Sequence, residues 1–149
     1  MKRATIAACC ALASVPSFAG DWAQAGMQED QALLVDSSSI VKTRNIRGAW
    51  MLAINRNDFS VGAYSVAWFD FDCKDKKMRG QDFQFYDLSG KVTMSGQLDE
   101  GWSRVFPGST GEVMLNSVCK NDAPVIFRNA TPHTAAKVIR EVLTKKNIW

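Results

Sequence analysis

The sequence has a single histidine and only a small excess of positive over negative charge, and each of these shortages narrows the possible functions. His133 is the only histidine among 149 residues, and no CxxC or HxxxH spacing occurs, so the sequence holds no recognisable zinc site. The 18 Lys and Arg residues barely exceed the 15 Asp and Glu residues. Proteins that bind the phosphate backbone of nucleic acids carry a marked basic excess, so the composition gives no basis for a nucleic-acid partner.

Motifs of the common enzyme classes are also missing: there is no phosphate-binding loop, nucleophile elbow or dinucleotide fingerprint. Asp70 and Asp72 form the densest acidic pair, and as alternate residues of a strand they share one face. Such a pair can hold a cation or act as an acid and a base. We favour a solvated strand end that neighbouring lysines neutralise. We therefore expect no enzymatic activity, no metal and no cofactor, and we expect His133 to be an exposed residue at a helix start.

The rest of the composition is that of an ordinary globular protein, with 46% hydrophobic, 22% charged and 10% aromatic residues. This excludes a disordered chain, a collagen-like chain and a coiled coil. A length of 149 residues suffices for one domain with a hydrophobic core and is too short for two. Since no repeat, linker or low-complexity tract occurs, we expect a single domain at residues 20–149.

The first 19 residues have the layout of a secretory signal peptide. Lys2 and Arg3 precede a short apolar run, and Ser17-Phe18-Ala19 places small residues at the minus-three and minus-one positions of a cleavage site before Gly20. The run is shorter than the roughly 20 apolar residues that span a bilayer, and no later segment is long or apolar enough. Lipidation at Cys9 is the alternative. We expect an exported protein that is periplasmic, on the cell surface or secreted.

Cleavage before Gly20 leaves two cysteines, Cys73 and Cys119. In an oxidising compartment, two cysteines in one exported chain most often form a disulfide, which we expect here. A catalytic thiol is one alternative, but a thiolate nucleophile needs a base such as imidazole, and His133 lies at a predicted helix start. A metal site is the other alternative, although its usual ligand spacing is missing.

The alternation of apolar residues predicts an α+β fold whose antiparallel β-meander sheet has about five to six strands. The expected strands are residues 32–35, 47–55, 63–73, 77–87, a segment around Val92 and Met94, and 102–106. Residues 20–29 are expected to be a loose lead-in, and 55–62 a loop. Because short turns join consecutive strands, the strands pair antiparallel. Apolar residues on both faces of 63–73 predict a central position for that strand.

Two helices are expected after the strands. Ser109 and Glu112 form a capping box for the first helix, and Thr131 and Pro132 begin a second one that extends to about Lys146. The predicted buried stripe of the second helix consists of Ala135, Val138, Ile139, Val142 and Leu143. We expect both helices to cover one face of the sheet, with the disulfide joining the central strand to the first helix.

A family pattern covers about residues 32–121. Asp36-Ser37-Ser38-Ser39-Ile40 precedes Trp50 in a strand, and Asp72-Cys73 closes the next strand. Phe106-Pro107-Gly108-Ser109 then leads into the capped helix, which contains Val118-Cys119. The residues between and beside these segments that also match are Tyr86, Gly90, Trp102 and Glu112. In order and spacing, the sequence resembles the surface-adhesin protein E family of exported bacterial domains.

The resemblance implies an antiparallel sheet packed against helices, a cell-envelope location and binding to host extracellular-matrix proteins, with a homodimer as an option. Only Cys73 and Cys119 carry over as family residues, as a disulfide, since the family has no catalytic residues to transfer. The first functional hypothesis is therefore a binding module. The alternative is a small periplasmic structural or inhibitor protein without adhesin activity, which a protruding rigid loop would favour.

A basic segment beside an aromatic residue is the candidate contact surface of such a binding module. Lys42, Arg44 and Arg47 place three positive charges within six residues, and Trp50 follows at the start of a strand. Arginine and aromatic residues are enriched at protein interfaces. We expect the contact surface on this segment or on the sheet face away from the helices.

We predict that the exported protein begins at Gly20. N-terminal sequencing of protein recovered from the periplasm or the medium should read Gly20-Asp21-Trp22, because the small residues before Gly20 suit signal peptidase. An exported form that begins at an acylated Cys9 would contradict this prediction.

Overall fold

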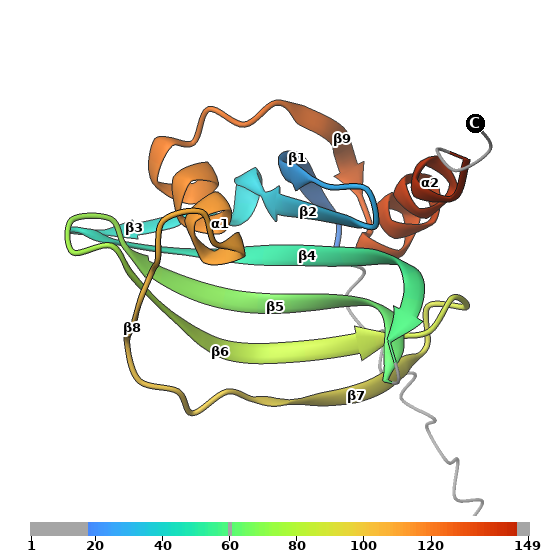
Figure 1. Ribbon diagram of the computed structural model, residues 1–149, viewed down its shortest axis with the longest axis horizontal. Helices are drawn as coiled ribbons and strands as arrows, with labels where there is room; N and C mark the ends of the chain where they lie inside the picture. Colours follow the sequence, from blue (N-terminus) through green and yellow to red (C-terminus); the bar gives the residue numbers. More distant parts are fainter. Residues whose placement is uncertain (1–17, 60, 146–149) are drawn as a thin grey trace, which may run out of the picture.

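The computed structural model describes residues 18–59 and 61–145, which form a large antiparallel sheet and its helices (Figure 1). The strands in this part of the chain are β1 (Gly20–Met27), β2 (Gln31–Asp36), β3 (Val41–Thr43), β4 (Ile46–Phe59), β5 (Gly62–Asp72), β6 (Lys77–Tyr86), β7 (Val92–Gln97), β8 (Ser103–Arg104) and β9 (Val125–Ala130). The helices are the 3-10 helix η1 (Ser37–Ser39), α1 (Thr110–Lys120) and α2 (Pro132–Lys145). The strand order is β7-β6-β5-β4-β2-β1-β9, with β3 beside β4 and β8 beside β6.

The middle of the sheet is the predicted antiparallel meander. β4, β5, β6 and β7 follow one another both along the chain and across the sheet. On β4, Leu52 and Ile54 face one side, and Ala49 and Met51 face the other, as their alternation predicts. β5 lies between β4 and β6, which confirms its central position.

The two helices lie on opposite faces of this sheet, so the expectation that both would cover one face is wrong. α2 packs through Ile139 on the face that contains Leu52, here called the α2 face. α1 packs through Val118 on the other face, against Met51 and Phe71, here called the α1 face. The physical reason lies in the strands. Because β4 and β5 are apolar on both faces, each face needs its own cover.

The described part of the chain has nine strands rather than the five to six expected. β1 occupies the predicted loose lead-in, β9 lies where no strand was predicted, and β4 continues to Phe59 through most of the predicted loop. Polar and glycine residues obscure these strands in the sequence, but neighbouring strands pair with their backbone. Trp22 of β1 is fully buried, and its Nε1 donates to the carbonyl oxygen of Ala130 at 2.9 Å.

Both predicted helix starts are confirmed. Ser109 Oγ accepts a hydrogen bond from the backbone N–H of Glu112 at 3.2 Å, and the Glu112 carboxylate accepts one from the N–H of Gly108 at 2.8 Å. Thr131 Oγ1 likewise accepts a hydrogen bond from the N–H of Thr134 at 3.2 Å. These side chains satisfy backbone donors that a helix start leaves unpaired.

The buried stripe of α2 is narrower than predicted. Its buried residues are Ala135, Ala136, Ile139 and Leu143. Val138 and Val142 were expected in the stripe but are 45% and 40% exposed. α2 packs mainly on β4 and β9, so one narrow side of the helix meets the sheet, and the two valines lie on its flank.

The predicted disulfide joins Cys73 to Cys119. Cys73 directly follows β5, and Cys119 lies in the last turn of α1. After β8, which pairs with β6, the chain passes through α1 to β9 at the opposite edge, so α1 crosses the face of the sheet (Figure 1). The bond therefore anchors the crossing helix to the end of the central strand.

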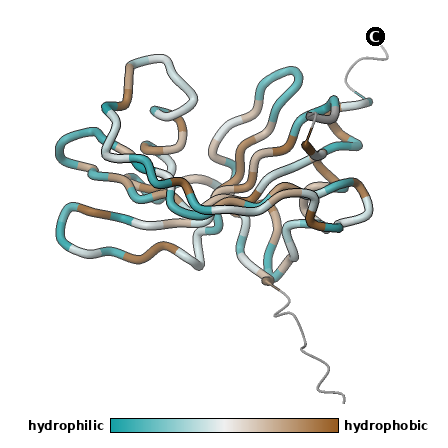
Figure 2. The backbone as a smooth tube through the Cα atoms, turned by 90° about the horizontal axis from the view of Figure 1, so that it is seen from below, coloured by the Kyte–Doolittle hydropathy of each residue, from teal (hydrophilic) through white to brown (hydrophobic). Residues whose placement is uncertain are grey.

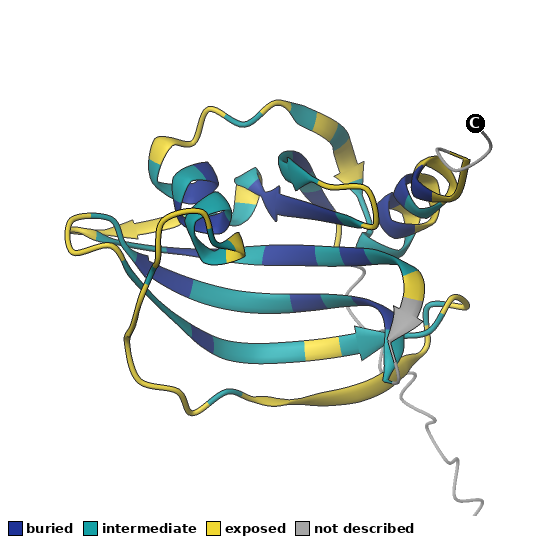
Figure 3. Cartoon of the chain, in the orientation of Figure 1, coloured by how far each residue is buried: buried dark blue, intermediate teal, exposed yellow. Residues whose placement is uncertain are grey.

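Burial is greatest in the middle of the sheet (Figure 3). Every residue of β7 is exposed, and several loop tips at the ends of the strands are hydrophilic (Figure 2). On the α2 face, β6 and β7 therefore lie beyond the strands on which α2 mainly packs. This leaves part of the sheet open to a ligand.

We predict that the domain depends on its disulfide for stability. Cys73→Ser should lower the free energy of unfolding by about 2–4 kcal/mol, because the bond restricts a long loop in the unfolded chain and fixes α1. Chemical denaturation of the wild type, the single variant and Cys73→Ser/Cys119→Ser measures this loss. An unchanged Tm in both variants would show that packing alone holds α1 in place.

Candidate binding groove

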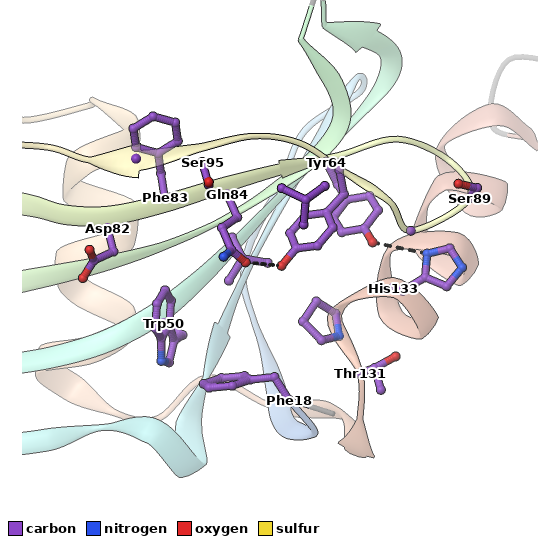
Figure 4. A pocket seen from close by; sticks show the side chains of 16 residues that line it. Phe18, Trp50, Tyr64, Asp82, Phe83, Gln84, Ser89, Ser95, Thr131 and His133 are labelled. Atoms are coloured by element: carbon purple, nitrogen blue, oxygen red, sulfur yellow. Dashed lines mark hydrogen bonds between the residues drawn. The ribbon is translucent and has the colours of Figure 1, made fainter. Parts of the chain in front are cut away.

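The α2 face of β4 to β7 is hollowed into an open groove with a volume of about 930 Å³ (Figure 4). Its walls come from four neighbouring strands, the turn after β6, the start of α2 and Phe18, which precedes β1. The lining residues are Phe18, Trp50, Tyr64, Val66, Asp82, Phe83, Gln84, Tyr86, Ser89, Gly90, Val92, Ser95, Gly96, Thr131, Pro132 and His133. Aromatic and small polar side chains dominate this set.

Two tyrosines from neighbouring strands form the middle of the groove. The register of β5 and β6 places Tyr64 opposite Tyr86 and Val66 opposite Gln84, so all four side chains share the α2 face. The two phenol rings stack with their centroids 4.9 Å apart and their planes 4° from parallel. The Tyr86 hydroxyl donates to Oε1 of Gln84 at 2.5 Å. Their contacts hold these side chains as an ordered apolar surface with a polar edge.

The phenols of this pair are uncharged hydrogen-bonding groups at neutral pH. Burial raises the pKa of Tyr64 far above its usual range, and the nearby Tyr86 and Asp87 raise it further. Burial also raises the pKa of Tyr86. Tyr64 is buried, with 3% of its surface exposed, and supports the ring of Tyr86, which is half-buried. Tyr86 can therefore stack on a ligand and accept a hydrogen bond from it, which is the chemistry of binding.

His133 closes one end of the groove. Its Nδ1 lies 3.2 Å from the Tyr64 hydroxyl oxygen, and its ring packs beside the turn that contains Gly90. The turn is held by Asp87, whose carboxylate accepts hydrogen bonds from the Ser89 hydroxyl and the Lys91 N–H, both of which lower its pKa. His133 is therefore half-buried in a wall of the groove, not the exposed residue expected from the sequence.

Trp50 stands toward the opposite end, where its ring contacts two other aromatic rings. Its ring centroid is 5.4 Å from those of Phe18 and Trp68, and both pairs meet edge to face at 79°. Asp82 lies beyond Trp50, at the end of the groove away from His133 (Figure 4). Among the described residues that line the groove, Asp82 is the single carboxylate, and none is a lysine or arginine.

The four residues predicted as a contact surface do not all lie together in the structure. Lys42 and Arg44 are exposed in the β3–β4 hairpin, and Lys42 lies opposite Arg47 across the two strands. Arg47 Nη1 donates to the carbonyl oxygen of Val118 at 2.9 Å and so holds the end of α1. Trp50 lies on the opposite face, in the groove. Binding by these four residues stays a prediction.

The acidic pair at the end of β5 is occupied by local hydrogen bonds. Asp70 is buried and accepts from Arg79 Nη2 at 2.9 Å, from Trp68 Nε1 at 3.0 Å and from the Gln81 amide. Asp72 accepts from the backbone N–H groups of the following turn at 3.0 and 2.9 Å. Within the described residues, no group of three or more metal-ligating side chains comes together. Asp70 and Asp72 therefore organise the strand end. The expectation of a solvated pair neutralised by lysines is wrong for Asp70, because it is buried and Arg79 is its ion-pair partner.

Sequence reasoning missed the groove because it depends on register. The alternation in residues 82–86 correctly put Gln84 and Tyr86 on one face, and the alternation in β5 did the same for Tyr64 and Val66. Which residues meet is set by a bulge in β6, where two residues between Gly80 and Phe83 lie opposite the one residue between Ala67 and Phe69 of β5. Nothing in the local sequence marks this bulge.

We predict that Gly90→Ala destabilises the domain more than Gly108→Ala. Both glycines have a left-handed backbone, with φ of 85° and 76°, so both substitutions cost about 1–2 kcal/mol in backbone strain. A Cβ at Gly90 would also lie 3.0 Å from His133 Nδ1, whereas one at Gly108 meets nothing within 4 Å. Thermal unfolding measures the difference. Equal Tm losses would show that the turn does not pack against His133 in solution.

One known protein family matches this chain. The pattern of the Surface-adhesin protein E family matches residues 22–120, a range that contains Trp50, Tyr64, Tyr86 and both bonded cysteines and ends before α2. No curated protein and no solved structure matches the chain. Among the helices of the described residues, none has the length and hydrophobicity needed to cross a bilayer. The family match extends over most of the chain, and the chain therefore belongs to the surface-adhesin protein E family.

Proposed function

We propose that this chain is a cell-envelope binding module that recognises host extracellular-matrix proteins. Membership of a surface-adhesin family supports an exported or surface location and a protein partner. The observation that carries the proposal is the open groove, in which Trp50, Tyr64 and Tyr86 line a surface large enough for several side chains of a partner. Aromatic side chains dominate the energetics of many interfaces because each buries a large apolar area.

The exposed β3–β4 hairpin is the proposed second contact. Lys42 and Arg44 extend from it, and Arg47 lies beside Lys42 while it also holds α1. Exposed charges attract a partner of opposite charge over about 8 Å at physiological ionic strength. The hairpin would therefore steer acidic regions of a matrix protein toward the module.

The location of the module decides whether it can meet a host protein. We place it in the periplasm or at the cell surface after cleavage before Gly20. Digestion of intact cells with an added protease, followed by immunoblotting, distinguishes the two. A surface pool supports adhesion, whereas a purely periplasmic pool contradicts binding to a host matrix.

We predict that Lys42→Glu/Arg44→Glu weakens matrix binding by roughly tenfold, because two attractive exposed charges become repulsive. Arg47 stays unchanged in this variant, so α1 keeps its hydrogen bond. The measurement is a biosensor titration of the exported form against a panel of purified matrix glycoproteins and collagen, at low and physiological salt. Binding by the wild type should weaken as salt is raised.

The matched control is Lys137→Glu/Lys145→Glu, which makes the same change in net charge at exposed positions of α2. It should bind like the wild type. Equal binding by all three proteins would remove the hairpin from the interface, and no binding to any member of the panel would contradict the proposed function itself.

A further inference from the structure

The chain places one of its own aromatic side chains in the groove. Phe18 lines the groove, and its ring meets the Trp50 ring edge to face with the centroids 5.4 Å apart. Phe18 is 44% exposed, so its ring is partly covered and partly open to solvent. The groove as it stands therefore holds a phenylalanine side chain against Trp50.

The structure also marks where the folded domain begins. The backbone becomes strand β1 at Gly20, and the Asp21 N–H donates to the buried Asp36 carboxylate at 3.0 Å. A Cβ added to Gly20 would lie 2.5 Å from that carboxylate, so a glycine is needed here. Trp22 is fully buried two residues later. Cleavage before Gly20 would therefore remove Phe18 and leave every one of these contacts intact.

Removal of Phe18 uncovers one side of Trp50. Trp50 still contacts Trp68, whose ring meets it edge to face at 79°. Apolar and uncharged side chains line most of the groove around this place, and among the described lining residues Asp82 is the single carboxylate. Aromatic rings prefer edge-to-face or offset contacts with other rings, which favours an aromatic side chain against Trp50. A carboxylate such as that of Asp82 favours a cation beside it.

We propose that the groove binds a segment of a partner protein in which an aromatic residue stands next to a basic one, and that Phe18 fills the aromatic place until the chain is cut before Gly20. The aromatic side chain docks on Trp50, and the basic one lies toward Asp82. This inference rests on the proposed binding function and names its contact. The uncut chain carries its own occupant and is blocked, and the exported form is open.

Fluorescence anisotropy with a labelled peptide tests both parts of the proposal. The probe is acetyl-Ala-Ser-Lys-Phe-Ala-Ser with a fluorophore at its carboxyl end, and the control peptides replace its Phe by Ala or its Lys by Glu. The three protein forms are the full chain, the full chain with Phe18→Ala, and the form that begins at Gly20. The form that begins at Gly20 should bind the probe at least about tenfold more tightly than the full chain. Phe18→Ala should restore the binding of the full chain.

Two variants of the form that begins at Gly20 locate the contact. Trp50→Ala should abolish binding of the probe, while Trp102→Ala, at a partly exposed tryptophan outside the groove, should leave it unchanged. Asp82→Asn should reduce the preference for Lys over Glu in the peptide and keep the preference for Phe over Ala. Asp82→Asn hardly changes the size of the side chain. It therefore remains informative if circular dichroism shows that Trp50→Ala does not fold.

Equal affinity of the full chain and the form that begins at Gly20 would overturn the role of Phe18. Equal affinity for the Phe and Ala peptides, or full binding by folded Trp50→Ala, would overturn the groove as the site. If the form that begins at Gly20 self-associates, and the probe peptide dissociates these oligomers, then a second copy of the chain occupies the groove. That result would overturn the assignment to a partner protein.

The matrix panel separates this inference from the proposed function. Probe binding without matrix binding would contradict the proposed function and support the groove. Matrix binding that neither the probe nor Trp50→Ala affects would overturn the groove inference and leave the proposed function standing.

Discussion

Strands β4 and β5 carry apolar side chains on both faces, and the need to bury both faces determines most of the architecture. A sheet of this kind cannot leave either face in water, so one helix covers each side. The chain reaches the α1 face by sending α1 across the sheet from β8 toward β9. The Cys73–Cys119 bond and the hydrogen bond from Arg47 then hold the crossing helix at its end. The core, the topology and the disulfide thus have one common cause.

The same constraint explains why the groove exists where it does. α2 covers the α2 face mainly over β4 and β9, and the sheet continues beyond it to β7. The aromatic side chains on the uncovered part are buried or half-buried and shield one another: Tyr64 stacks on Tyr86, and Trp50 lies against Trp68. A surface of this composition is stable in water and still gains from further burial. Such a surface is suited to reversible binding of a ligand.

The features that could be predicted from the sequence are the local ones. The alternation on β4 and β5, the cap at Ser109 and the start of α2 at Thr131 each depend on residues a few positions apart. β1 and β9 could not be predicted, since their polar residues form strands only when a distant partner supplies hydrogen bonds. The separation of Arg47 from Trp50 did have a local sign, because residues three apart on a strand face opposite sides. The groove itself needs the bulge in β6, whose one-residue shift decides which side chains meet.

The pairing of β1 with β9 bears on the order of events during export. The Trp22 indole of β1 donates to the carbonyl oxygen of Ala130, 108 residues further along the chain. In a chain threaded through a membrane amino terminus first, β1 emerges early and lacks this acceptor until almost the entire domain has followed. Native pairing is therefore completed last at the very strand that crosses first. A topology with many such distant contacts folds slowly, because the entropy of closing long loops is lost before those contacts form.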